Sequence, residues 1–221
     1  MTKEIEFKIF TKNKGFNITA NIIVYSLLFS GIGIAYLAKR YLDNSTIESL
    51  GQGVGILACL LMIYYKITQA SKRKSLNGNL NKKLRFRSRE ISIDDINIEL
   101  NEIKKIEFYI GDYFDKWESQ APGDFSPART NGTSNICELT LINGHKAEAN
   151  FQLMYENEFL KMRELLLQYY SENKIHFLKL IEYLGIEKYE EIQEFKKTLP
   201  PTLATVAQPL NFLNLNQYRP F

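Results

Sequence analysis

The sequence predicts an α+β protein: a hairpin of two transmembrane helices, followed by an antiparallel sheet and then by further helices. Two long apolar segments, at about residues 15–38 and 49–67, predict the helical hairpin. Apolar and polar residues alternate from residue 80 onward, which is typical of half-buried strands. Apolar residues then recur at helical spacing after residue 158. The 221 residues suffice for a membrane anchor and one modest domain.

The two apolar segments are long enough to cross a bilayer. The first, Gly15 to Ala38, has no charged residue in 24 positions, and the second, Ser49 to Tyr65, has none in 17. A helix needs about 20 apolar residues to span a hydrocarbon core of about 30 Å. A buried helix of a soluble protein usually has a polar stripe, and a signal peptide has a shorter apolar run and a cleavage site. Neither alternative fits as well as two spanning helices.

The distribution of Lys and Arg predicts the orientation of the hairpin. The N-terminal residues 1–14 contain four lysines, and residues 66–89 contain nine Lys or Arg and no acidic residue, whereas the connection at residues 39–48 has only two basic residues. By the positive-inside rule, both termini lie in the cytoplasm and the connection lies outside. The expected location is the inner membrane of a bacterium.

A basic collar joins the second helix to the domain. We expect it to contact the anionic inner leaflet of the bilayer without selecting a headgroup. Residues 90–221, in contrast, contain 13 basic and 21 acidic residues. The collar residues are Lys72, Arg73, Lys74, Lys82, Lys83, Arg85, Arg87 and Arg89.

Small residues indicate how the helices pack. Gly51 and Gly55 are four residues apart in the second segment, and Gly31 and Ala35 have the same spacing in the first. Small residues at this spacing let two helix backbones approach closely. The pattern is compatible with packing inside the hairpin and with formation of a homodimer.

Alternating residues predict a series of hairpins after the collar. Ile91 and Ile93 are followed by Asp94-Asp95 and a second alternating run, as in a β-hairpin. Asn143-Gly144 separates two further alternating runs and suits a type I′ turn. An amphipathic helix follows, with apolar residues at Phe159, Met162, Leu166 and Tyr169.

Two stretches carry a resemblance to pleckstrin-homology domains and their GRAM relatives. They are "LNEIKKIEF", which follows an early hairpin, and "ELTLINGHKAEANFQL", which runs directly into the helix. The resemblance covers about residues 76–171 and implies an antiparallel split β-barrel with a C-terminal helix. The preceding helix pair is similar to an arrangement in small uncharacterised bacterial membrane proteins. The resemblance implies no catalytic residue.

The expected organisation follows from these patterns. Residues 1–14 form a cytoplasmic tail, residues 15–67 the helical hairpin, and residues 68–79 a basic linker. The pleckstrin-homology-like domain spans residues 80–171, a helical extension residues 172–199, and a C-terminal tail residues 200–221.

A long loop, Gly111 to Asn135, is the first candidate for contact with a protein partner. It is rich in aromatic residues and contains the single tryptophan of the chain. Aromatic residues and Arg are enriched at interface hot spots, but the same rings are compatible with a lid packed on the core. The candidate residues are Tyr113, Phe114, Trp117, Phe125 and Arg129.

No pattern of catalytic, cofactor-binding or metal-binding residues occurs in the sequence. The two cysteines and two histidines have no spacing typical of a metal site, and nothing indicates binding of nucleic acid. We therefore expect a non-enzymatic protein that binds a protein partner or acts as a scaffold at the membrane. The alternatives are an accessory subunit of a membrane transport complex and a lipid-headgroup-binding domain. The second alternative derives from Lys74 and Arg85-x-Arg87, whose spacing matches phosphoinositide-binding residues of pleckstrin-homology domains.

Overall fold

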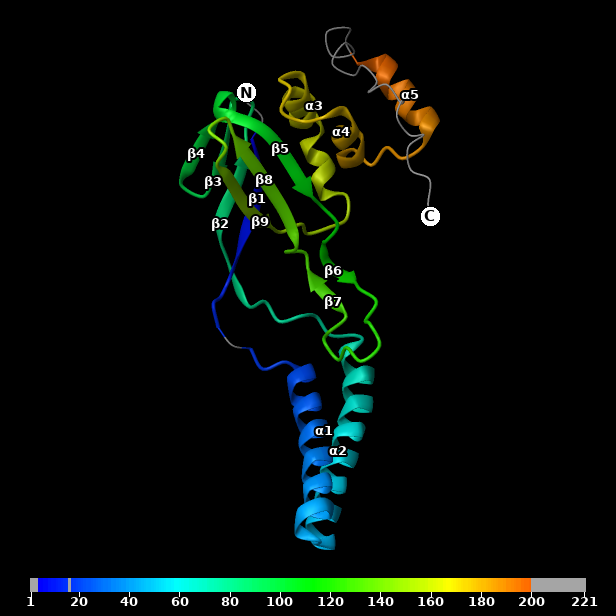
Figure 1. Cartoon of the computed structure of the whole chain (residues 1–221). Coiled ribbons are helices and arrows are strands. Elements are labelled where there is room, and N and C mark those ends of the chain that lie inside the picture. Colours follow the sequence, from blue (N-terminus) through cyan, green and yellow to red (C-terminus); the bar gives the residue numbers. More distant parts are fainter. Residues whose placement is uncertain (1–3, 16, 200–221) are drawn as a thin grey trace, which may run out of the picture.

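The computed structural model describes residues 4–15 and 17–199 (Figure 1). It is an α+β structure, in which a pair of long helices projects from a domain of one large sheet and several shorter helices. The expected C-terminal tail, residues 200–221, lies outside the described residues.

The projecting helices are α1 (Ala20–Leu37), which continues in a π-helical segment (Ala38–Leu42), and α2 (Ser45–Gln69). Both are long and apolar enough to cross a membrane, and only 11% of each apolar span is buried inside the protein. This exposure indicates association with a membrane. The expected ten-residue connection is shorter in the structure, because Asn44 begins α2 by accepting hydrogen bonds from the backbone N–H groups of Thr46 (3.0 Å) and Ile47 (3.2 Å).

Small residues bring α1 and α2 into close contact. A Cβ atom on Gly31 would lie 2.6 Å from the backbone nitrogen of Gly55, and one on Gly51 would lie 2.5 Å from that of Ala35. Any side chain at Gly31 or Gly51 would therefore force the helices apart. The small residues at this spacing thus pack within the hairpin.

The domain contains a seven-stranded antiparallel sheet with the order β4-β3-β2-β1-β9-β8-β5. The strands are β1 (Ile5–Lys12), β2 (Gly78–Phe86), β3 (Glu90–Ile93), β4 (Ile96–Glu99), β5 (Ile103–Tyr109), β8 (Asn135–Leu141) and β9 (Lys146–Phe151). Strands β4 and β5 are consecutive in the chain, joined by a 3₁₀ turn (Leu100–Glu102), but they form the two opposite edges. The expectation of a barrel is therefore wrong in this respect, because the sheet does not close.

The N-terminal segment is a central strand, and the expectation of a tail is wrong. Strand β1 pairs with β2 from Ile5 opposite Phe86 to Lys12 opposite Gly78, and on its other side Ile9 pairs with Phe151. The alternating residues Ile5, Phe7 and Ile9 are buried. The helical hairpin is consequently an insertion between two neighbouring strands, β1 and β2.

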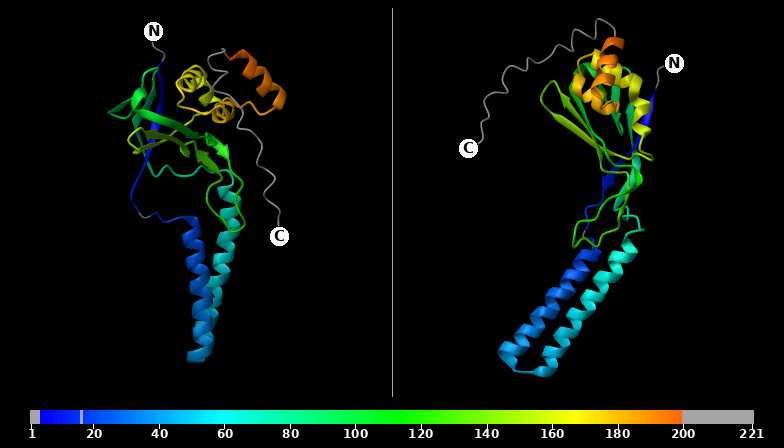
Figure 2. Two further views of the ribbon diagram at one scale, coloured as in Figure 1. Left: turned by 45° about the horizontal axis from the view of Figure 1, so that its top comes forward. Right: turned by 90° about the vertical axis from the view of Figure 1, so that its right-hand side faces the viewer.

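Helices after β9 complete the hydrophobic core. They are a 3₁₀ segment (Glu158–Met162), α3 (Arg163–Ser171), α4 (Phe177–Tyr183) and α5 (Tyr189–Thr198), which lie beside the sheet (Figure 2). The ring of Phe108 lies 5.0 Å from that of Phe159 and 5.3 Å from that of Tyr183, measured between centroids. The expected helical extension thus shares one core with the sheet.

Of the two turns expected from the sequence, the structure contains one as expected and the other in a different form. Asp94-Asp95 joins β3 to β4, and Asp94 has the positive φ of 58° that a tight hairpin requires. At the second turn only Gly144 has a positive φ, of 85°. Leu141 donates a backbone hydrogen bond to His145 (2.8 Å), which leaves a three-residue loop. The expected two-residue type I′ turn is therefore wrong.

Candidate interaction site

The long loop lies between the sheet and the helical hairpin, and we name residues 111–135 the junction loop (Figures 1 and 2). Part of it forms a two-stranded ribbon of β6 (Phe114–Trp117) and β7 (Arg129–Asn131). It occupies the space between the two parts of the molecule, and Tyr113 at its start packs against the core of the sheet domain.

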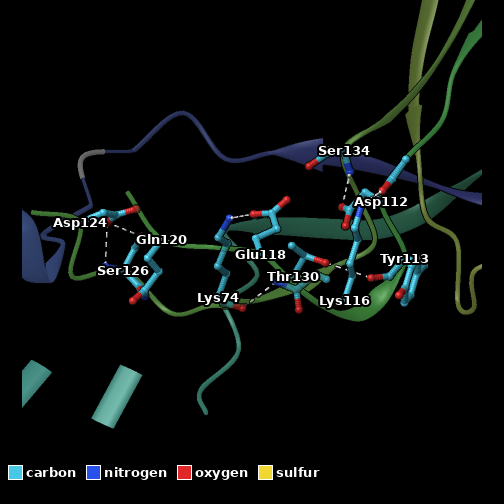
Figure 3. Close-up of polar contacts among 12 residues, drawn as sticks. Lys74, Asp112, Tyr113, Lys116, Glu118, Gln120, Asp124, Ser126, Thr130 and Ser134 are labelled. Atoms are coloured by element: carbon cyan, nitrogen blue, oxygen red, sulfur yellow. Dashed lines mark hydrogen bonds and ion pairs between the residues drawn. The ribbon is translucent and has the colours of Figure 1, made fainter. Parts of the chain in front are cut away.

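Asn135 ties the two ends of the junction loop together. Its fully buried side chain accepts hydrogen bonds from the backbone N–H groups of Gly111 (3.1 Å) and Asp112 (3.0 Å) and donates to the carbonyl oxygens of Gly132 and Phe151. Asp112 also accepts a hydrogen bond from the backbone N–H of Ser134 at 2.9 Å (Figure 3). These buried bonds fix the direction in which the loop leaves the sheet.

The tip of the junction loop contacts helix α1. The side chain of Asn21 donates a hydrogen bond to the Asp124 carboxylate (2.9 Å) and accepts one from the backbone N–H of Phe125 (2.7 Å). The Tyr25 hydroxyl donates to the carbonyl oxygen of Gly123 (2.8 Å), and the rings of Tyr25 and Phe125 lie 5.9 Å apart. The loop is therefore attached to the hairpin by both polar and aromatic contacts.

Asp124 remains ionised in this contact. Ser126 donates to its carboxylate from both the hydroxyl (2.6 Å) and the backbone N–H (2.9 Å; Figure 3). These bonds, with the one from Asn21, lower the pKa of Asp124 from 3.8 to about 2. Lys66 of α2 donates to the carbonyl oxygen of Asp124 at 3.2 Å, so the same residue contacts both helices.

The segment after α2 binds along the other side of the junction loop. Backbone hydrogen bonds join Arg129 to Lys72 (3.1 Å) and Lys74 to Arg129 (2.8 Å). The Asp115 carboxylate forms ion pairs with Arg73 (2.7 Å) and Arg129, which lower its pKa, with the hydrogen bond from Arg73 the largest cause. The linker is thus held by backbone and side chains together.

The five candidate partner-binding residues have different environments. Phe125 is buried against Tyr25, and the guanidinium of Arg73 lies 3.9 Å above the ring of Phe114. Tyr113 is partly buried against the core, and Arg129 is paired with Asp115. Trp117, in contrast, is 60% exposed. Four of the five candidate residues therefore make contacts within the chain, whereas Trp117 remains largely exposed.

The basic collar is divided between two places. Lys72, Arg73 and Lys74 lie in the linker beside the hairpin, whereas Lys82, Lys83 and Arg85 lie on β2, and Arg87 and Arg89 follow it. Four of these last five residues form ion pairs with carboxylates: Lys82 with Asp94 (2.8 Å), Lys83 with Glu6 (2.8 Å), Arg85 with Glu6 (3.2 Å) and Arg87 with Glu4 (2.8 Å). Bonds from Lys83 and Arg85 lower the pKa of Glu6, with that from Lys83 the largest cause. Much of the collar's charge is therefore balanced within the sheet.

The cysteines and acidic residues form no site of their own in the described chain. Cys137 is fully buried, and burial raises the pKa of its thiol. Cys59 is exposed on α2. Within residues 4–15 and 17–199, no group of three or more His, Cys, Asp or Glu side chains is placed to hold a metal ion.

Sequence reasoning missed a groove of 290 Å³ beside α4, which is lined by both apolar and polar side chains. Its floor includes Phe108, Phe159 and Leu184, and the exposed side chains of Ile110 and Leu160 also line it. The exposed acidic residues Glu156 and Glu182 lie along the same groove. The groove forms where β5 meets two segments that follow β9, so no local pattern could have indicated it.

Comparison with protein-family models gave no match, and no curated protein or solved structure matched the chain either.

Proposed function

We propose that the chain is a non-enzymatic membrane protein whose domain faces the cytoplasm and binds a protein partner. The groove lined by Phe108, Phe159 and Leu184 carries the proposal, because exposed apolar side chains beside a concavity are typical of protein interfaces. The Lys and Arg residues that flank the helices support the cytoplasmic orientation.

The groove favours a particular class of partner. Its apolar floor suits the side chains of a short helix or extended segment. Glu156 is exposed along it, and so is Glu182, which pairs with Lys179 at 2.8 Å, so a partner segment with Lys or Arg beside its apolar residues would fit best. We therefore propose an apolar and basic protein segment as the ligand.

The order of the strands supports a pleckstrin-homology-like scaffold. Strands β1 to β4 are consecutive neighbours, β5, β8 and β9 form a second run of neighbours, and α3 follows. A meander capped by a helix is the pattern on which the resemblance was based. The alternative of lipid-headgroup binding has less support, because Arg85 and Arg87 are paired with Glu6 and Glu4.

Site-specific photocrosslinking in native membranes tests the groove. A photoreactive residue at Leu160 should give a discrete adduct, whereas one at Leu178, which is exposed on α4 but does not line the groove, should not. Reversing the groove charge with Glu156→Lys and Glu182→Lys should abolish the Leu160 adduct. Equal labelling at both positions, or an adduct that survives the charge reversal, would refute the proposal.

A further inference from the structure

The tip of the junction loop is an uncharged turn. Asp124 donates a backbone hydrogen bond to the carbonyl oxygen of Ala121 at 3.0 Å, and Gly123 between them has a φ of 81°. Proline followed by a glycine with positive φ is typical of a type II turn. Ala121, Pro122 and Gly123 are all exposed and carry no polar side chain. The exposed surface of this turn therefore carries no side chain that must stay in water.

The charged residues of α2 locate the surface of the bilayer. Glu48 and Lys66 enclose 17 uncharged residues, which rise about 25 Å at 1.5 Å per residue. Lys66 therefore lies at the boundary of the hydrocarbon core on the side of the domain, where a lysine can reach the headgroups. Tyr64 and Tyr65 precede it, and tyrosine is enriched at this depth.

Contacts with both helices place the loop tip at this boundary. Lys66 donates a hydrogen bond to the Asp124 carbonyl oxygen (3.2 Å), and the Tyr25 hydroxyl donates to that of Gly123 (2.8 Å). The ring of Tyr25 also lies 6.4 Å from that of Phe29, which is 68% exposed on the surface of the hairpin. The loop tip is thus continuous with a surface that faces lipid.

Trp117 lies slightly farther from the hydrocarbon core. Its neighbour Glu118 donates a backbone hydrogen bond to Ala128, which in turn donates to the carbonyl oxygen of Gln69. Gln69 follows Lys66 by three residues, a rise of about 4.5 Å. Gln69 thus lies at the depth of the headgroup zone, in which tryptophan is enriched, and the strand end at Trp117 is joined to it through these two hydrogen bonds.

We propose that the junction loop is a third membrane contact, in which the Pro122-Gly123 turn and the ring of Trp117 enter the headgroup zone of the bilayer. The inference rests on the membrane anchoring in the proposed function. The contact needs no anionic lipid, because the basic residues beside the loop already have carboxylate partners within the chain: Arg73 pairs with Asp115, and Lys74 with Glu118. It is therefore expected to persist in zwitterionic lipid and at high salt.

The single tryptophan makes the proposal testable in the full chain. The protein is reconstituted into phosphatidylcholine bilayers that contain lipids brominated either near the headgroup or near the end of the acyl chain. Bromine quenches a nearby indole, so Trp117 fluorescence should decrease more with the shallow quencher than with the deep one. The decrease should be the same at low and at high salt.

Two variants in a Trp117→Phe background serve as controls. Tyr189→Trp, at an exposed position on α5, should not be quenched, and Phe29→Trp should be quenched most by the deep bromines. If Phe29→Trp is quenched and Trp117 is not, the inference is wrong while the anchor stands. If neither is quenched, the membrane anchoring also fails. Equal quenching of Trp117 and Tyr189→Trp would show that the whole domain adheres to lipid, and would refute a specific role for the loop.

Discussion

Strand β1 should be indispensable for folding of the domain, although about 60 residues of helical hairpin and linker separate it from β2. A fragment of residues 77–199 lacks this strand. We expect this fragment to remain unfolded or to aggregate. The same fragment preceded by residues 1–13 and a two-residue Asn-Gly turn should fold without the membrane.

The structure gives the magnitude of the effect. Ile5, Phe7 and Ile9 are 6%, 3% and 6% exposed, respectively. Burial of each side chain contributes roughly 1.5–3 kcal/mol, so their removal costs about 5–9 kcal/mol. A domain of this size is stable by only about 5–15 kcal/mol. Loss of β1 would also leave β2 and β9 without their shared neighbour.

The geometry of the strand ends favours the short turn. Lys12 lies opposite Gly78 in the ladder, and Asn13 donates a backbone hydrogen bond to the carbonyl oxygen of Asn77 at 3.1 Å. Asn13 and Asn77 are therefore positioned as the last pair of a hairpin, which Asn-Gly can close.

Urea denaturation followed by circular dichroism compares the two fragments. The joined fragment should unfold in one cooperative transition, and Phe7→Ala should lower its free energy of unfolding by about 3–5 kcal/mol. Cooperative unfolding of residues 77–199 alone, with the same free energy, would refute the reasoning.

Three further predictions concern the hairpin and the junction loop. Gly51→Val should lower the melting temperature of the purified protein, because the new side chain would meet the backbone of Ala35. Gly53→Val is the control and should not lower it, because the space around Gly53 is open. Similar melting temperatures for the two variants would contradict the packing. Asn21→Ala should increase amide hydrogen exchange at Phe125, and the exposed control Asn17→Ala should leave it unchanged. The pKa of Asp124 is lowered from 3.8 to about 2, so the contact of the junction loop with α1 should be fully present above pH 3.8 and be lost as the pH falls toward 2. Amide hydrogen exchange at Phe125 should increase over the same pH range. Asp124→Asn should remove this dependence on pH.

Short-range patterns predicted much of the sheet. The alternation of Ile91 and Ile93 around the Asp94-Asp95 turn identified β3 and β4, because both strands and their turn are adjacent in the chain. Ile5, Phe7 and Ile9 alternate in the same way, yet they directly precede a long apolar segment, which favours a tail. Their partners on β2 and β9 are far along the chain, so no local pattern indicates the pairing.

The candidate site was predicted only in part for the same reason. The aromatic composition of the junction loop predicts that its rings make contacts, either with a partner or with the core, and the structure places Phe125 in a buried contact. What that residue contacts depends on the fold, because Asn21 and Tyr25 lie about 100 residues earlier. The groove at Leu160 depends on β5 and α4 meeting, which no single segment encodes.

Insertion of the hairpin into a β-hairpin has a mechanical consequence. Residues 13–19 and 70–77 are the sole connections from the helices to β1 and β2, which are neighbours in the middle of the sheet. If these two adjacent connections were the whole attachment, the domain could rotate relative to the helices about an axis that passes through both connections. The junction loop adds a contact through Asp124 to both helices, and this third point removes that freedom. The groove is therefore held toward one orientation relative to the helices, so the partner that we propose would approach it from a defined direction relative to the helix axes.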